Sequence, residues 1–335
     1  MKSAVRLLLL LLLLVAVLDN GARAQQKLAQ TGLKFLSVTS DARAAALGEA
    51  YTAVEGSSQC LFFNPAGIAG IERFSSFAVG QTRWIADINH FYGSVAISPF
   101  NGEYGVIGVF VQSVDYGALD ETIFATNSQG FTDLGTFNPR GLSAGIGYAR
   151  ALSSQFSVGG VVKYVRQDLG TAQVNLSGET SANVASAYAF DFGILYKTGF
   201  KSLTFGMTVR NFSRELRFVN EGFQLPLTFR IGLAMNVLDL ADMNDAMQKE
   251  HAALVTLEAE HPRDYAEQLK VGVEYTFMQT LSLRIGYIGP ADEHGVSYGV
   301  GLQRNFDGFG LGIDYAYTPF GVFTAVHRFN LQFAL

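Results

Sequence analysis

The residues of this chain that could take part in chemistry are charged side chains set at alternate positions of otherwise apolar segments. Glu258 and Glu260 are two residues apart, and Lys270 and Glu274 share one alternation in the next such segment. Because alternate residues of an extended strand face the same side, these charges would line one face. Such a face either compensates its own charges or offers ions a charged path. The principal candidates are Asp191, Arg230, Glu258, Lys270, Glu274, Arg284, Asp314 and Arg328.

These charges are not accompanied by the patterns of a catalytic or cofactor site. The sequence contains no HExxH motif and no glycine-rich phosphate loop, and Cys60 is its only cysteine. We therefore predict no catalytic residue, no metal site and no cofactor, and a protein that is not an enzyme. An outer-membrane hydrolase is the remaining enzymatic alternative, and no nucleophile–histidine arrangement supports it.

The composition favours a membrane barrel over membrane helices. Glycine (36 of 335 residues) and aromatic residues (13%) are frequent, whereas charged residues make up only 16%. After residue 24, no apolar run approaches the ~20 residues of a spanning helix. In a closed barrel each strand alternates between its lipid face and its inward face, so hydrophobicity never accumulates in one run.

Fourteen segments show this alternation, which predicts an all-β, 14-stranded antiparallel transmembrane β-barrel. In the last segment Phe329, Leu331, Phe333 and Leu335 alternate with polar or small residues. The segments are Phe74–Trp84, Ala86–Ser98, Tyr104–Val114, Gly141–Ala151, Phe156–Gln167, Ala187–Lys197, Leu203–Phe212, Leu225–Val237, Ala252–Glu260, Leu269–Phe277, Leu281–Ile288, Gly295–Gln303, Phe309–Tyr317 and Arg328–Leu335.

The connections between these segments alternate in length. If both termini are periplasmic, the odd-numbered connections are external, and they include the two longest, about 116–140 and 168–186. Most even-numbered connections are tight turns, as in bacterial outer-membrane barrels. The exception is Asp239–Glu250, for which we predict a short amphipathic helix on the periplasmic side.

The charged face of these strands would point into the lumen, because a cation on the lipid face costs about 2–4 kcal/mol at mid-depth. With Lys163, Arg210 and Glu260, the inward set holds six basic and five acidic residues. Since the signs nearly balance, we interpret the set as a structural network that fills the lumen, and a charged conduction path is the alternative.

The first residues of the chain form a secretory signal. Arg6 precedes Leu7–Leu14, the apolar core is too short to span a bilayer, and Ala22–Ala24 fits a cleavage site. We predict cleavage after Ala24 and a location in the bacterial outer membrane. The net charge of −5 makes nucleic acid an unsuitable partner.

Between the signal and the first strand lies a stretch of small residues without alternation, Asp41–Ile71. Ser40 or Asp41 can cap a short helix over Ala42–Leu47, which would end at Gly48. Proline fixes its own φ and restricts the residue before it, so a rigid turn is predicted further on. That turn consists of Asn64, Pro65, Ala66 and Gly67. We predict a signal peptide at 1–24, a plug segment at 25–72 and the barrel at 73–335.

Three motifs in this stretch resemble the start of PorV/PorQ-type outer-membrane proteins: Asp41-Ala-Arg-Ala, Ala46-Leu-Gly-Glu-Ala-Tyr-Thr-Ala-Val and Asn64-Pro-Ala-Gly-Ile-Ala. Those proteins are similar in architecture to the FadL fatty-acid transporters, whose N-terminal hatch also carries an Asn-Pro-Ala turn. Relatives usually have acidic residues before the Asn-Pro pair, where this chain has Glu55-Gly56-Ser57-Ser58. We therefore infer no ion site there.

The resemblance implies a role in type IX secretion, in which the protein binds exported or cell-surface proteins and contacts outer-membrane lipid. The alternative is a FadL-like transporter of hydrophobic small molecules, which would need an apolar pocket and a break in the barrel wall. A protein-binding role would instead use apolar residues of the external connections. The candidates are Phe124, Phe131, Leu134, Phe137, Phe320 and Phe323.

Overall fold

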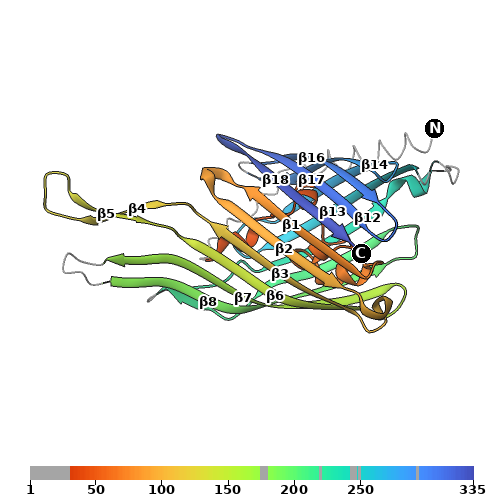
Figure 1. The fold of residues 1–335 in the computed structure, drawn as a ribbon, viewed down its shortest axis with the longest axis horizontal. Helices are drawn as coiled ribbons and strands as arrows, with labels where there is room; N and C mark the ends of the chain where they lie inside the picture. The colour runs from red at the N-terminus through yellow and green to blue at the C-terminus, as the bar shows by residue number, and fades with distance from the viewer. Residues whose placement is uncertain (1–30, 174–179, 219–220, 242–246, 248–249, 292–293) are drawn as a thin grey trace.

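The computed structural model describes residues 31–173, 180–218, 221–241, 247, 250–291 and 294–335. Fourteen of its strands form one closed antiparallel barrel (Figure 1). They are β1 (Ser75–Arg83), β2 (Asn89–Ile97), β3 (Val106–Asp115), β6 (Arg140–Ala151), β7 (Phe156–Gln173), β8 (Thr180–Lys197), β9 (Thr204–Phe212), β12 (Thr228–Asn236), β13 (His251–Pro262), β14 (Gln268–Phe277), β15 (Leu281–Gly289), β16 (Val296–Asn305), β17 (Gly310–Phe320) and β18 (Phe323–Ala334).

The barrel closes where its first and last strands pair. Val79 of β1 lies opposite Gly93 of β2 on one side and opposite Leu331 of β18 on the other. The predicted 14-stranded antiparallel barrel is therefore confirmed, and each of the fourteen alternating segments corresponds to one of its strands.

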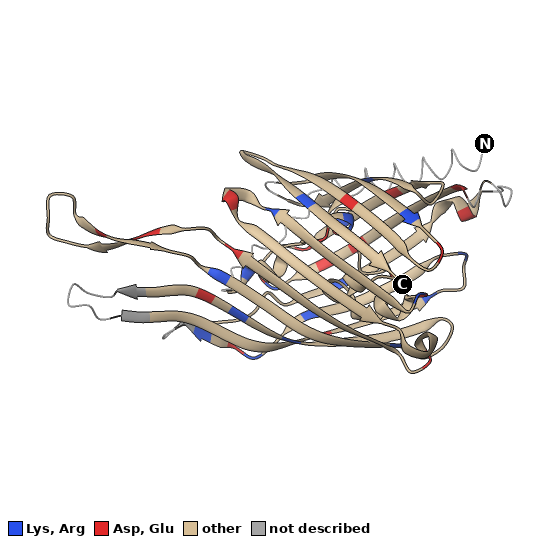
Figure 2. Cartoon of the chain, viewed as in Figure 1, with Lys and Arg blue, Asp and Glu red and all other residues tan. Residues whose placement is uncertain are grey.

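The side chains of the barrel are arranged opposite to those of a soluble protein. In β15, Leu283 and Ile285 are 53% and 48% exposed, whereas Arg284 between them is 8% exposed. Strands with apolar outer faces and charged inner faces match a wall that contacts lipid. Figure 2 shows the charged residues as isolated positions along otherwise uncharged strands.

The barrel has one end with long connections and one end with short turns. At the long-connection end, β4 (Leu119–Phe124) and β5 (Phe131–Phe137) form a hairpin, and β10 (Leu216–Phe218) pairs with β11 (Glu221–Phe223). The strands β7 and β8 are 18 residues each, longer than the 9–11 residues that cross a bilayer. They project with the β4–β5 hairpin beyond the barrel (Figure 1). The predicted long connection at 168–186 is thus in large part strand.

The short-turn end carries the even-numbered connections and the C-terminal residue. Met278 and Gln279, between β14 and β15, both have positive φ (51° and 52°), as the tight turn of a hairpin requires. Short 3₁₀ helices lie in two other connections of this end, η5 (Pro99–Gly102) and η6 (Val237–Leu240), whereas η4 (Ile85–Asp87) joins β1 to β2 at the opposite end. Of the helix predicted over Asp239–Glu250, residues 242–246 and 248–249 lie outside the described residues.

Residues 31–71 form a lumenal segment that runs inside the barrel from the long-connection end to the short-turn end (Figure 1). It contains α2 (Ala42–Ala46) and three 3₁₀ helices, η1 (Lys34–Ser37), η2 (Ser58–Phe62) and η3 (Pro65–Gly70). The helix α2 contacts β15–β18, and η3 contacts β6–β8 on another side. Among the described residues, no helix is long and apolar enough to cross a membrane.

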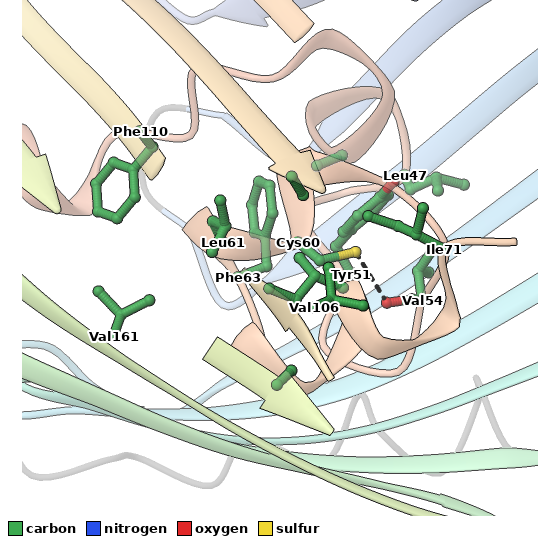
Figure 3. Close-up of a cluster of buried hydrophobic side chains, with 14 residues drawn as sticks. Leu47, Tyr51, Val54, Cys60, Leu61, Phe63, Ile71, Val106, Phe110 and Val161 are labelled. Carbon is green, nitrogen blue, oxygen red and sulfur yellow. Dashed lines mark hydrogen bonds between the residues drawn. The ribbon is translucent and has the colours of Figure 1, made fainter. Parts of the chain in front are cut away.

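The middle of the lumenal segment has an apolar core of its own (Figure 3). Tyr51 packs its ring against Phe63 at 4.9 Å between centroids, and Leu61 reaches the wall residues Val106 and Val161. Cys60 is buried in this core, where its Sγ donates to the carbonyl of Val54 (3.5 Å). Burial raises the pKa of the Cys60 thiol to about 11, so the thiol is uncharged and unreactive at neutral pH.

Candidate functional site

The helix α2 begins at Asp41, which caps it and also fixes it to the wall. The Asp41 carboxylate accepts a hydrogen bond from the backbone N–H of Ala44 (2.7 Å) and another from the hydroxyl of Tyr92 (2.8 Å) on β2. Burial raises the pKa of Asp41, while the bond from Ala44 opposes that shift. Of the two predicted caps, Ser40 and Asp41, the structure therefore uses Asp41, and Gly48 follows the helix with φ 61°.

The predicted turn at Asn64, Pro65, Ala66 and Gly67 opens the 3₁₀ helix η3 and docks it on the barrel. Asn64 caps that helix through Oδ1, which accepts from the N–H of Ala66 (3.1 Å). Its Nδ2 donates to the carbonyl of Thr52 (2.8 Å) and to the carbonyl of Ile194 on β8 (2.9 Å). One fully buried amide thus joins two parts of the lumenal segment to the wall.

Glycines of the wall allow this close approach. A Cβ on Gly193 would overlap Oδ1 of Asn64, and a Cβ on Gly159, directly opposite Gly193, would lie 2.6 Å from the backbone N of Ala66. Three further cross-strand glycine pairs face other parts of the segment in the same way, next to Leu61, Thr52 and Leu47 respectively. These pairs are Gly108–Gly147, Gly206–Gly232 and Gly272–Gly286.

We call these four pairs the glycine seats, and the sequence analysis missed them. Their signal was available, since each glycine occupies an inward position of its strand. The sequence does not show which residues of the lumenal segment lie against each facing glycine pair. Three of the seats bring the segment's backbone directly against the wall, and the fourth, Gly108–Gly147, makes room for the side chain of Leu61.

The first cluster of lumenal charges links the helix α2 to β14, β15 and β17. Glu274 accepts two hydrogen bonds from Arg43 of the lumenal segment (2.9 and 2.7 Å) and one from Arg284 of the wall (2.5 Å). Arg284 also donates to Asp314 (2.5 Å). Glu274 is therefore shared by a cation of the segment and a cation of the barrel.

The second cluster surrounds Lys270. The Lys270 ammonium lies 2.9 Å from Glu49 of the lumenal segment and also pairs with Glu260. Arg230 lies 3.1 Å from Glu260 and 3.3 Å from Glu258. Although burial alone would raise the pKa of Glu49, the ammonium of Lys270 lowers it to about 2.

Glu258 also binds the segment through its backbone. Its carboxylate accepts from the N–H groups of Tyr51 (3.0 Å) and Thr52 (2.8 Å), just after Glu49 in the chain. Two adjacent backbone donors that would otherwise be buried without partners are thereby satisfied.

The third cluster lies within the wall. Lys163 pairs with Asp191 (2.6 Å) and donates to Asn211 (2.6 Å), and Asp191 accepts the N–H of Asn211 (2.7 Å). Asn211 has φ 61°, and the register between β8 and β9 shifts between Phe190 and Phe192. This cluster therefore holds an irregular place in the wall.

Arg328 differs from the other predicted network residues. Its guanidinium donates to the carbonyl of Thr39 (2.8 Å) and to the hydroxyl of Thr318 (2.8 Å), and it lies over the Trp84 ring at 5.4 Å. The eight predicted residues thus fall into three separate ion-pair clusters and one arginine held by neutral groups.

The apolar candidates of the external connections also divide. Phe124 is 79% exposed on the β4–β5 hairpin, with Phe131 and Leu134 exposed beside it, and Phe323 is exposed near the β17–β18 turn. Phe137 lies at the base of the hairpin against Gly170. Phe320 was predicted to be exposed, and this is wrong: it is 8% exposed because it packs on Trp84 (5.2 Å) and His294 (4.6 Å).

A GxSxG motif, a type that the sequence was expected to lack, is present as Gly295-Val-Ser-Tyr-Gly299. In hydrolases the serine of such a motif stands on a sharp turn between a strand and a helix. Here Ser297 lies inside the strand β16, buried on its inward face. The motif therefore lacks the geometry of a nucleophile. Among the described residues, no cluster of His, Cys, Asp and Glu side chains could hold a metal ion.

Two cavities open at the short-turn end, one of about 440 Å³ and one of about 290 Å³. Gln303, Asn305 and Gln332 line both of them, and Arg284 and Asp314 form part of the smaller one. Amide and charged groups would have to lose their hydration to accept an apolar molecule. These cavities therefore do not suit a hydrophobic cargo.

Comparisons with known proteins agree with this architecture. The family model described as "Type IX secretion system protein PorV" matches residues 21–254. The solved structures include the Pseudomonas putida toluene transporter TodX, with a TM-score of 0.57 and 13% identity over 92% of this chain and 98% of that chain. The CymD monoaromatic hydrocarbon channel also has a TM-score of 0.57, with 11% identity over 90% of this chain and 98% of that one. No curated protein matches the chain.

Proposed function

Because this chain belongs to the PorV family of type IX secretion system proteins, we propose that it is a sealed barrel of the bacterial outer membrane that binds partner proteins at its long-connection end. The family places it in type IX secretion, and the likeness to solved structures concerns the barrel fold. The sealed lumen and the partner-binding end are our inferences.

The contacts between the lumenal segment and the barrel wall are the observation that carries the proposal. Three of the glycine seats bring the segment's backbone against the wall and the fourth receives the Leu61 side chain, and ion pairs from Arg43 and Glu49 cross between segment and barrel. Breaking one buried pair leaves an uncompensated charge, which costs about 3–5 kcal/mol. Removing the whole segment would break several at once. A barrel closed in this way acts through its outer surfaces.

The long-connection end supplies the surface for partners. In barrels of this type the long connections are external and the short turns periplasmic. The β4–β5 hairpin carries Phe124 and Phe131 beyond the barrel, and exposed aromatic side chains often anchor protein interfaces. Exposed β4–β5 edges also offer backbone groups for strand addition.

The runner-up is transport of hydrophobic small molecules, since TodX is a toluene transporter and CymD a monoaromatic hydrocarbon channel. One feature favours it, the irregular wall between β8 and β9. The polar lining of the two cavities opposes it. We therefore prefer the partner-binding role.

A capture experiment tests this role. The purified barrel would be cross-linked to proteins exported by the native secretion system, and the double variant Phe124→Ser/Phe131→Ser compared with it. Since truncating an anchoring aromatic typically costs about 2 kcal/mol, recovery should fall at least about tenfold. The control is Phe200→Ser, which alters an equally exposed aromatic at the short-turn end. Equal losses from both variants, or no loss from either, would contradict the proposal.

A further inference from the structure

A second group of buried apolar side chains fills the lumen near the long-connection end. Leu33, Phe35 and Leu36 of the lumenal segment are 1%, 2% and 4% exposed there. Gly141 of β6 makes room for the ring of Phe35, since a Cβ would lie 2.8 Å from it. We call the surrounding wall the apolar chamber; its residues are Val114, Val165, Ala185, Ala187, Ala189, Leu216 and Leu225.

The wall of the barrel is incomplete beside this chamber. Pairing of β8 with β9 ends at Phe190 and Phe212, and β12 begins only at Thr228, whereas β8 continues to Thr180. The connection at 213–227 covers this interval, with β10 against β8. The chamber is thus bounded on one side by a connection and not by paired strands.

Thr31–Ser37 lies against that connection in the manner of a bound peptide. The N–H of Gly32 donates to the carbonyl of Gln224 (3.0 Å), and Thr31 forms a parallel β-bridge with the same residue. Lys34 pairs with Asp264 and lies over the Tyr265 ring at 4.6 Å. One strand-like backbone contact, a hydrogen bond from the Thr31 hydroxyl to Asp264, three apolar side chains and one ion pair therefore hold these residues.

This hold is separable from that of the rest of the lumenal segment. Glycine seats and buried ion pairs fix Asp41–Ile71, whereas the Lys34 side chain is 44% exposed. Leu33 has φ 54°, a left-handed conformation that a leucine adopts at a cost. The contacts that hold Thr31–Ser37 are therefore different from those that hold Asp41–Ile71.

We propose that the apolar chamber is a receptor site for an extended peptide of a partner protein, and that Thr31–Ser37 occupies it until the partner arrives. The order Leu-Lys-Phe-Leu indicates the chemistry of that peptide: apolar residues around one basic residue, which Asp264 receives. Gln224 offers the backbone partner for strand addition. The assignment of this peptide to an exported protein rests on the proposed function. The inference that the chamber can bind a peptide rests on the contacts of Thr31–Ser37 alone.

The test uses the purified full-length protein and a fluorescent peptide with the sequence of residues 31–40. The variant Leu33→Ser/Phe35→Ser/Leu36→Ser, its folding verified by heat-modifiable electrophoretic mobility, should bind the peptide at least tenfold more tightly than the unaltered protein. A peptide with the same three serines should not bind. Adding Asp264→Asn to the vacated barrel should weaken binding several-fold.

A second variant covers the case in which the triple variant does not fold. Lys34→Glu should raise peptide binding by the otherwise unaltered protein, and Lys34→Glu/Asp264→Lys should return it to the starting level. A folded, vacated barrel that ignores the peptide would overturn the proposal, as would one filled by a fluorescent fatty acid that the peptide cannot displace. A third result is that the barrel binds the peptide while Lys34→Glu cells display exported proteins normally. This result would support the receptor site and would contradict only the statement that its partner is an exported protein.

Discussion

At the scale of single residues, several lumenal carboxylates each contact two partners, one in the lumenal segment and one in the barrel wall. Glu274 is held by Arg43 and Arg284 together, and Glu258 accepts two backbone N–H groups while facing Arg230. Such residues connect the segment to the barrel, which ion pairs within the wall do not do. A single substitution at one of these carboxylates should therefore destabilise both the seating of the segment and the barrel wall.

Glu274→Leu should destabilise the barrel by about 3–5 kcal/mol, because it leaves Arg43 and Arg284 facing each other without their shared carboxylate. Thermal unfolding of the purified protein in detergent would measure this. The control is Val273→Ile, on the opposite face of the same strand, for which we expect a change below about 0.5 kcal/mol. Similar losses from both variants would show that inward and outward faces are assigned wrongly.

The contact between Glu49 and Lys270 should make the seating of the segment depend on pH. The folded pKa of Glu49, about 2, lies below its unfolded value, so its contribution is fully present above about pH 4.5 and is lost as the pH falls toward 2. Glu49→Gln should therefore lower the melting temperature clearly at pH 7, with the difference shrinking between pH 4.5 and 2. A difference that stays constant over this range would refute the assignment.

At the scale of elements, the fourteen strands could be predicted because lipid outside and charge inside impose a period of two on every strand. The hairpin β4–β5 and the parts of β7 after Gln167 and of β8 before Ala187 escaped prediction, since beyond the bilayer no lipid face imposes that period. The lumenal helix and the Asn64 turn followed from capping chemistry. The glycine seats did not, because their role depends on which residues of the segment face them.

The glycine seats make an element-scale prediction. Gly193→Ala should destabilise the protein by about 1–3 kcal/mol, because the added methyl group would displace Asn64 and break its bond to Ile194. The matched control is Gly312→Ala on β17, where the nearest atom to the new Cβ is 3.5 Å away. Melting temperatures that fall equally in the two variants would mean that the seat adds nothing beyond the cost of changing a strand glycine.

At the scale of the whole molecule, the charges of the wall and the lumenal segment complement each other. The inward wall positions hold one more basic than acidic residue, and the segment adds Asp41, Glu49 and Glu55 against Lys34 and Arg43. Two of the three ion-pair clusters include a charge of the segment, Arg43 in one and Glu49 in the other. Because the charges of the wall are balanced only together with those of the segment, we infer that the segment occupies the lumen when no partner is bound.

This complementarity leads to a prediction about conductance. The purified barrel in a planar bilayer should pass almost no ions, because the segment packs directly on the glycine seats and its charges are paired with the wall. Deleting residues 41–71 should open a stable pore, since fourteen strands enclose more space than their inward side chains fill. Heat-modifiable mobility would verify that the deleted barrel folds, and Gly193→Ala would reveal whether one disturbed seat already causes leakage. Steady conductance by the unaltered protein, or a folded deletion variant that stays closed, would show that the lumenal segment is not what seals the barrel.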